Sequence, residues 1–316
     1  MAKKSDRSQI LATLRRASLD EATAYAFMEQ QRWGDSPACP HCGVVDVYQM
    51  RDRRSGGRHK HFRWRCRGCG QMFSVRTGTV LEESRLPLRV WVYAFWKACS
   101  SKKGISALQI SRECEITHKS ALFLMHRIRL AMAESPEDQP LLSGTIEADE
   151  TYVGGRPRYK TSKREAARAR ADRKAIVFAM VERGGRVRAQ HIDRIHGGNL
   201  KAELRRRVDR SSRVITDEAT YYIGLDRDFE AGHETVNHRK GEYVRGDVYT
   251  NTAEGFFALL KRGIYGTFHS VSKHHLHRYV SEFEFRWNHR KIDDDSRTLA
   301  AISGAEGKRL TYRPAC

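Results

Sequence analysis

Four cysteines in two close pairs constrain the fold of this chain more than any other feature. The pairs are Cys39 with Cys42 and Cys66 with Cys69. Between the pairs lie 23 residues, and a glycine follows each pair, at Gly43 and Gly70, where the backbone turns tightly beneath a metal ion. Four thiolates at this spacing match a tetrahedral zinc site. Redox-active pairs or unliganded cysteines are the alternatives.

The residues between the two pairs indicate a small basic ribbon. Residues 44–50 and 61–65 alternate in the way that strands do. Arg63 and Arg65 lie in the second stretch and are candidate DNA contacts. Because such a ribbon buries little apolar surface, a bound metal contributes its folding free energy directly. We therefore expect a zinc ribbon with a structural Zn²⁺ ion.

The charge of the chain points to a polyanionic partner. The 316 residues include 58 Lys and Arg against 38 Asp and Glu, a net charge of +20. Lysine and arginine gain affinity by releasing counterions from phosphates, so DNA is the leading expectation, and charge that only aids solubility is the alternative. The N-terminus lacks the apolar core of a signal peptide, and no run approaches the ~18 apolar residues that span a bilayer. We expect a cytoplasmic protein with reduced thiols and no membrane contact.

Apolar residues recur at helical spacing on both sides of the ribbon. Residues 6–33 read as one helix, and residues 86–134 read as several helices. A break at residues 115–117 gives the second segment the pattern of a helix-turn-helix unit. Its last helix would carry Lys119, Arg127 and Arg129 toward DNA. A helical hairpin that only packs is the alternative.

The remainder of the chain shows the order of an α/β domain. Three successive antiparallel strands are expected, then a crossover helix, a fourth strand and a short fifth strand. The corresponding residues are 144–155, 174–185, 186–195, 197–208, 212–222 and 233–239. On the first strand, Ile146 and Ala148 face one way, and Glu147 and Asp149 face the other.

A helix is expected within residues 246–266, and it places an acid and a base on one face. Glu254 and Lys261 are seven residues apart, which is about two helical turns. Such a pair suits a site that holds a metal ion and a phosphodiester. The alternative is a capping box, in which Glu254 only bonds back to Asn251 at the helix start.

Three acids from separate elements form the candidate catalytic set. Asp149 lies within a strand, Asp217 at the end of another, and Glu254 on the helix. Metal-dependent phosphodiester chemistry requires carboxylates from separate elements to meet, and two Mg²⁺ or Mn²⁺ ions suit such oxygen ligands better than zinc does. The basic segment between Gly154 and Lys174 is either a solvated loop or an arm that grips DNA, and the sequence favours neither.

Residues from Gly144 to Arg290 resemble the DDE transposases of bacterial insertion sequences, in the ISXO2-like subgroup with an N-terminal zinc ribbon. The matching pieces are CPHCG, CRGCGQMFSVRTGTV, IEADETYVGG, VITDEA and NTAEGFFALLKRGIYGTFHSVSKHHLHRYVSEFEFRWNHR. The resemblance implies a ribonuclease H-like catalytic domain. In that domain Asp149, Asp217 and Glu254 form the acidic triad, and Lys261 is the basic residue that follows it.

The resemblance also implies an activity. The protein would bind terminal inverted repeats in double-stranded DNA, cleave the DNA ends to leave 3′-hydroxyls and join them to target DNA, as a homo-oligomer in the bacterial nucleoid. Arg262, next to Lys261, is a further candidate DNA contact, and Asn251 and Asp247 are candidates to lie near the metals. Glu147, Glu150 and Glu218 are expected to support the site or to lie at the surface.

The sequence therefore predicts a multidomain protein. The expected parts are an N-terminal helical segment (1–35), the zinc ribbon (36–80), a helical DNA-binding module (81–135), the catalytic domain (141–291) and a C-terminal tail (292–316). Two other functions are compatible with these features: a domesticated DNA-binding regulator that no longer cuts, and a metal-dependent nuclease of the same fold.

Overall fold

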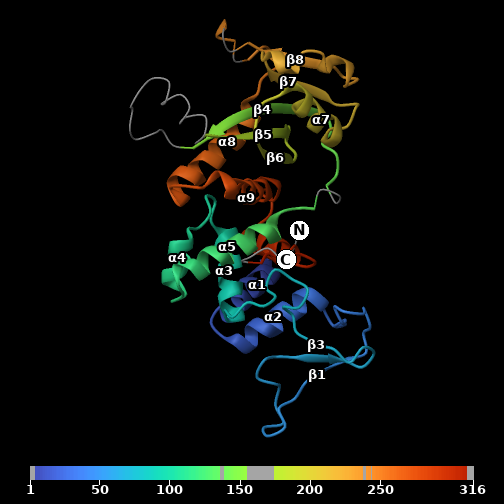
Figure 1. Ribbon diagram of the computed structural model, residues 1–316, viewed down its shortest axis with the longest axis vertical. Helices are drawn as coiled ribbons and strands as arrows, with labels where there is room; N and C mark the ends of the chain where they lie inside the picture. Colours follow the sequence, from blue (N-terminus) through green and yellow to red (C-terminus); the bar gives the residue numbers. More distant parts are fainter. Residues whose placement is uncertain (1–3, 136–138, 155–173, 238–239, 243, 312–316) are drawn as a thin grey trace. The chain divides into compact units, whose positions relative to one another are not determined.

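The computed structural model describes residues 4–135, 139–154, 174–237, 240–242 and 244–311. The chain forms two compact units, one of Met1–Met132 with Ile292–Cys316 and one of Ala133–Lys291 (Figure 1). The basic segment that the sequence analysis considers as an arm, between Gly154 and Lys174, lies outside the described residues.

Two helices begin the first unit, where the sequence pattern predicts a single helix over residues 6–33. They are α1 (Lys4–Ala17) and α2 (Glu21–Trp33). The side chain of Asp20 accepts hydrogen bonds from the backbone N–H of Thr23 at 2.7 Å and from its hydroxyl at 2.6 Å. Because Asp20 is the N-cap of a second helix, the first helix ends before it. The prediction of one continuous helix is therefore wrong.

The ribbon that follows α2 is a three-stranded antiparallel sheet. Its strands are β1 (Val47–Gln49), β2 (Trp64–Cys66) and β3 (Met72–Phe73), in the order β1-β2-β3. Trp33 at the end of α2 packs edge-on against Trp64 and Phe73, with ring centroids 5.8 and 5.7 Å apart. This small aromatic core joins the ribbon to α2.

Four further helices complete the first unit. They are α3 (Leu88–Ser100), α4 (Ala107–Glu113), α5 (His118–Met132) and α10 (Asp294–Ser303). Helix α10 occupies the region expected to be a tail, packs against α3 and buries Ala301 and Ile302. Asp293 caps it by accepting a hydrogen bond from the N–H of Ser296 at 2.8 Å.

The second unit is built on a mixed five-stranded sheet with the order β6-β5-β4-β7-β8. Its strands are β4 (Thr145–Val153), β5 (Ala175–Glu182), β6 (Val187–Ile192), β7 (Arg213–Asp217) and β8 (His233–Val236). β4, β5 and β6 pair antiparallel, whereas β7 is parallel to β4 and β8 is parallel to β7. Helix α7 (Gly197–Arg207) makes the crossover, as the element order predicts.

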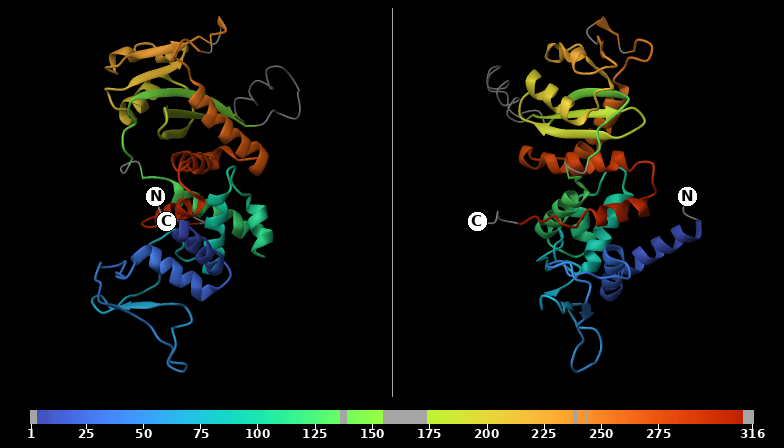
Figure 2. Two further views of the ribbon diagram at one scale, coloured as in Figure 1. Left: turned by 180° about the vertical axis from the view of Figure 1, so that it is seen from behind. Right: turned by 90° about the vertical axis from the view of Figure 1, so that its right-hand side faces the viewer.

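Helices cover both faces of this sheet. The helices α8 (Asn251–Gly263) and α9 (Leu276–Asn288) pack on one face (Figure 2). Phe256 and Phe283 of these helices share a buried apolar cluster with Val177 and Val181 of β5. On the other face, Leu204 of α7 packs with the apolar residues of β4, β5 and β7. This arrangement is consistent with a ribonuclease H-like domain.

Close packing fixes α8 against α9. A Cβ atom at Gly263 would lie 2.0 Å from the Cζ atom of Phe283, so only glycine allows this approach. A π-helical turn, Ile264–Phe268, follows α8, and single 3₁₀ turns occur at Thr220–Tyr222, Leu225–Arg227 and Lys273–His275. Among the residues that the structure describes, no helix is long and apolar enough to cross a bilayer.

Candidate catalytic and zinc sites

Two of the three predicted acids lie on neighbouring parallel strands. The register pairs Thr145 with Arg213 and Glu147 with Ile215. If this register is continued by two residues, Asp149 lies beside Asp217. In a parallel pair, residues in register point to the same face of the sheet. The fold thus brings together two acids that are separated by a helix and two strands in the sequence.

The environment of Asp149 is strongly unfavourable for its negative charge. Burial and the carboxylates of Glu150, Asp217 and Glu254 raise the pKa of Asp149 to about 7. The contributions of Asp217 and Glu254 show that both carboxylates lie within electrostatic range of Asp149. A cation bound among these groups would relieve the repulsion, as expected for a metal site.

Glu147, two residues before Asp149, holds the N-terminus of α8. Its carboxylate has no solvent exposure and accepts the backbone N–H groups of Thr252 at 2.7 Å and of Ala253 at 3.0 Å. It also accepts the hydroxyl of Thr252 at 2.8 Å. A buried carboxylate on these free N–H groups caps the helix and complements its dipole. Glu147 therefore ties the helix that carries Glu254 to the strand that carries Asp149.

Arg183 completes this connection. Its Nε atom donates to Glu147 at 2.6 Å, and its two terminal nitrogens donate to the carbonyls of Asp247 at 2.7 Å and Tyr249 at 2.8 Å. The guanidinium also lies 3.7 Å from the centroid of the Tyr249 ring. Arg183 thus neutralises the buried carboxylate and fixes the segment that leads into α8.

The local geometry removes the capping-box alternative for Glu254. The N-cap of α8 is Thr250, and the N–H of Glu254 donates to the Thr250 carbonyl at 3.0 Å. Glu254 is therefore one residue too late for the reciprocal bond of a capping box. Its exposed side chain is available for another role, with Lys261 two turns further along the same helix.

Two tyrosines that the sequence analysis does not single out hold Glu150 on the opposite face of β4. The hydroxyl groups of Tyr221 and Tyr222 both donate to the Glu150 carboxylate, that of Tyr222 at 2.6 Å. These tyrosines follow Asp217 closely, and Asp217 accepts the N–H of Ala219 at 3.1 Å. The contacts fix the end of β7 beside β4. The only sequence signal for these contacts is the pair of aromatic residues that follows the acidic end of the strand.

Asp247 is unsuited to the metal site that the sequence analysis considers for it. Both of its carboxylate oxygens accept hydrogen bonds from Arg213, one of them at 3.2 Å, and this arginine lowers the pKa of Asp247. Its carboxylate is thus already neutralised at the edge of the sheet. Asn251, the first residue of α8, is exposed.

The four cysteines of the ribbon fit a zinc ion. The Sγ atoms of Cys39 and Cys69 lie 3.7 Å apart, and those of Cys42 and Cys66 lie 3.6 Å apart. Four sulfurs at about 2.3 Å from a tetrahedral zinc ion would lie about 3.8 Å apart. The structure therefore supports a structural Zn²⁺ site.

The acidic set is more open than the cysteine set. Within the described ranges, the cysteines form the only group of three or more Cys, His, Asp or Glu residues whose ligand atoms all lie within 4.8 Å of one another. The oxygens of Asp149, Asp217 and Glu254 therefore do not all lie within this distance of one another. Their oxygen-only donor set still suits hard cations such as Mg²⁺ and Mn²⁺.

The predicted DNA contacts differ in their exposure. Arg63, Arg65 and Arg262 are exposed, as is Lys119 near the start of α5. Lys261 is half-buried.

Two further predicted contacts on α5 do not fit a DNA-binding surface. Arg127 and Arg129 are 6% and 1% exposed. Arg127 donates to the carbonyls of Glu82 at 2.9 Å and Leu310 at 3.0 Å, so it stabilises the first unit. The spacing of basic residues along α5 could not reveal these partners, because they come from distant segments.

Comparison with known proteins matches both parts of the chain. Residues 141–288 match the ISXO2-like transposase domain, and residues 19–72 match the transposase zinc-ribbon domain. The chain is also 30% identical over 278 residues to the uncharacterized protein in transposable element ISH50 of Halobacterium salinarum, across 85% of this chain and 91% of that protein. The chain belongs to the ISXO2-like transposases. The resemblance noted in the sequence is thus confirmed.

The matched regions of this transposase contain both candidate sites. Asp149, Asp217, Glu254 and Lys261 all lie within the transposase domain match. The four cysteines lie within the zinc-ribbon match. The family and the local geometry therefore single out the same two regions of the chain.

Proposed function

We propose that this protein is the transposase of an insertion sequence and catalyses cleavage and joining of DNA ends. The observation that carries the proposal is the neighbouring placement of Asp149 and Asp217 on β4 and β7, together with the effect of Asp217 and Glu254 on the pKa of Asp149. Structural carboxylates are normally paired with cations, as Glu147 is with Arg183. Among the described residues, no cationic partner is recorded for Asp149.

Asp149, Asp217 and Glu254 would hold two divalent cations, Mg²⁺ or Mn²⁺. Such ions activate the attacking oxygen and stabilise the leaving oxygen of a phosphodiester. Glu147 and Arg183 fix the strand that carries Asp149 relative to the helix that carries Glu254. Strand pairing with β4 fixes β7, which carries Asp217. The site is thus preorganised, and no serine or tyrosine nucleophile is required.

Lys261 would position the DNA strand in this site. Within the described residues its ammonium group has no recorded hydrogen bond or ion pair, and it lies on α8 with Glu254. A cation there can bind a phosphate oxygen next to the scissile bond, and the exposed Arg262 can bind a neighbouring phosphate.

The first unit would recognise the terminal inverted repeats. It contains the zinc ribbon and the helix pair α4–α5, joined by the four residues 114–117 in the manner of a helix-turn-helix unit. Because two element ends must be joined to one target, we propose that the transposase acts as a homo-oligomer on DNA.

A strand-transfer assay tests the proposal. Purified protein is incubated with Mg²⁺ or Mn²⁺, a DNA end that carries the inverted repeat, and a plasmid target. Joined product supports the transposase. Cleavage without joining would indicate a nuclease, and binding without cleavage would indicate a DNA-binding regulator.

The variant Asp149→Asn separates a catalytic from a structural role. We expect it to abolish cleavage and joining but to retain DNA affinity, because DNA recognition is assigned to the first unit. The matched control is Glu230→Gln, which removes one charge from an exposed glutamate of the second unit. Loss of DNA affinity in Asp149→Asn alone would show that Asp149 is needed for folding instead.

A further inference from the structure

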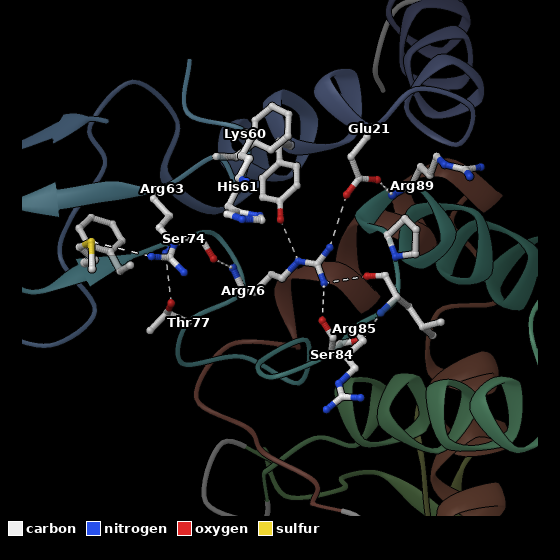
Figure 3. A pocket seen from close by; sticks show the side chains of 16 residues that line it. Glu21, Lys60, His61, Arg63, Ser74, Arg76, Thr77, Ser84, Arg85 and Arg89 are labelled. Atoms are coloured by element: carbon white, nitrogen blue, oxygen red, sulfur yellow. Dashed lines mark hydrogen bonds and ion pairs between the residues drawn. The ribbon is translucent and has the colours of Figure 1, made fainter. Parts of the chain in front are cut away.

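A large basic cavity lies within the first unit, whereas the three candidate catalytic acids belong to the second unit. Its volume is about 780 Å³, and it is lined by the ribbon, the start of α2 and the segment that enters α3 (Figure 3). Its single carboxylate belongs to Glu21. Its basic side chains are Lys60, His61, Arg63, Arg76, Arg85 and Arg89.

Arg76 holds the three segments together at the centre of the cavity. Its Nε atom donates to the hydroxyl of Tyr25 on α2 at 3.0 Å. One terminal nitrogen donates to the carbonyls of Ser84 at 2.9 Å and Leu86 at 2.8 Å, just before α3. The other lies 3.5 Å from the Glu21 carboxylate. These contacts, visible in Figure 3, indicate that the cavity is formed before any ligand binds.

The single carboxylate of the cavity is already engaged. Glu21 accepts the backbone N–H groups of Leu88 at 2.7 Å and Arg89 at 3.0 Å, so it caps the start of α3. Its remaining contact is the ion pair with Arg76. Glu21 therefore neutralises the helix end and Arg76, and leaves the other cations of the cavity uncompensated.

Three of these cations are exposed and unpaired. For the side chains of Lys60, Arg85 and Arg89, the described part of the chain provides no recorded hydrogen bond or ion pair. In Figure 3, Lys60 lies on the ribbon side of Arg76, and Arg89 lies on the α3 side. Like charges around one cavity repel each other unless an anion binds between them.

An aromatic wall accompanies the cations. The ring of Phe62 lines the cavity and stacks on Tyr25, with centroids 4.1 Å apart and an interplanar angle of 11°. Phe62 has a φ of +52°, a conformation that is uncommon for a non-glycine residue. Tyr25 is buried, so the partly exposed Phe62 offers the apolar surface for deoxyribose next to the cations that would meet phosphates.

We propose that this cavity binds the sugar-phosphate backbone of DNA, with Lys60, Arg85 and Arg89 contacting phosphates. The inference deepens the proposed function, on which it rests, because it assigns the DNA contact to a defined part of the first unit. An acidic peptide is the other class of anionic occupant. The net charge of +20 and the spread of cations over three segments favour the regularly spaced phosphates of DNA.

The salt dependence of DNA binding tests this assignment. The full-length, zinc-loaded protein is titrated with a DNA duplex of arbitrary sequence over a range of salt concentrations. For Arg85→Ala/Arg89→Ala we expect the magnitude of the slope of log K against log salt to decrease by about 2. Each lost phosphate contact should reduce by about eightfold the gain in affinity that the protein shows when salt is lowered from about 1 M to about 0.1 M. Zinc content and melting temperature verify the fold.

Arg15→Ala/Arg16→Ala is the matched control, because it removes two exposed arginines of α1 in the same unit. We expect its slope to stay close to that of the wild type. An equal decrease in both double variants, or no decrease in either, would overturn the proposal. If the cavity variant alone lowers the slope but the wild type cleaves and joins no DNA, the proposed catalytic function fails and the binding site stands.

Discussion

The buried Glu147 carboxylate provides the sharpest test of how the catalytic domain is held together. Replacing it by alanine would leave the partly buried Arg183 without its carboxylate and the N–H groups of Thr252 and Ala253 without their acceptor. Removing one partner of a buried ion pair typically costs about 3–5 kcal/mol. We expect Glu147→Ala to lower the free energy of unfolding by this amount. Glu147→Gln keeps the size and one acceptor oxygen, so it should cost about 1.5–3 kcal/mol.

Replacement of Glu147 should also reduce the rate of strand transfer without affecting DNA affinity. Glu147 holds the first turn of α8, the same turn that carries Glu254. Misplacing a catalytic group by about 1 Å can cost about 100-fold in rate, so we expect strand transfer by Glu147→Gln to slow by about 10- to 100-fold. Urea unfolding and single-turnover joining measure the two effects.

The exposed glutamate Glu230 serves as the control for these measurements. Glu230→Ala should change the free energy of unfolding by less than about 0.5 kcal/mol and leave the joining rate unchanged. If Glu147→Ala were as stable as Glu230→Ala and joined DNA at the wild-type rate, the account of Glu147 as the anchor of α8 would be refuted.

Three further predictions concern other parts of the molecule. Because burial and neighbouring carboxylates raise the pKa of Asp149 to about 7, its charged form destabilises the metal-free fold, and stability falls as pH rises between about 4 and 7. Asp149→Asn should therefore raise the free energy of unfolding at pH 8 without added Mg²⁺ by about 1–3 kcal/mol and have little effect at pH 4; equal effects at both pH values would contradict this reasoning. Gly263→Ala should cost about 1–3 kcal/mol in thermal or urea unfolding, because its Cβ would meet the Phe283 ring, whereas Gly255→Ala, whose Cβ would lie 4.0 Å from the nearest atom, should stabilise α8 by about 0.5–1 kcal/mol; similar values for both would count against the packing argument. Cys66→Ser should lose bound zinc and DNA affinity, while Cys114→Ser, outside the cluster, should keep both; metal analysis that finds zinc in Cys66→Ser would exclude the four-cysteine site.

Features encoded by local spacing were predictable from the sequence. The spacing of the cysteines predicts a compact zinc-ribbon site, and the four Sγ atoms do gather in the structure. The alternation along residues 144–155 places Glu147 and Asp149 on one face, and the element order predicts the crossover before β7. These signals depend on near neighbours in the chain and on connection rules that hold for most folds.

Contacts between distant residues were not predictable. Glu147 binds the start of α8 more than a hundred residues later, and Arg127 binds carbonyls of Glu82 and Leu310. No periodic pattern reveals such partners. The helix caps at Asp20 and Asp293 use a local signal, because each aspartate accepts the N–H of the residue three positions later. The cap at Asp20 was missed because the helical periodicity continues across it, and the cap at Asp293 was missed because the last residues were expected to be a tail.

Binding of Mn²⁺ to the zinc-loaded, DNA-bound transposase, followed by electron paramagnetic resonance, tests most directly whether the three acids form one metal site. The account predicts that the wild type binds two Mn²⁺ ions per chain. It also predicts that Asp149→Asn, Asp217→Asn and Glu254→Gln each weaken this binding at least about tenfold, while Glu230→Gln does not. Wild-type Mn²⁺ binding in all three acid variants would contradict the account.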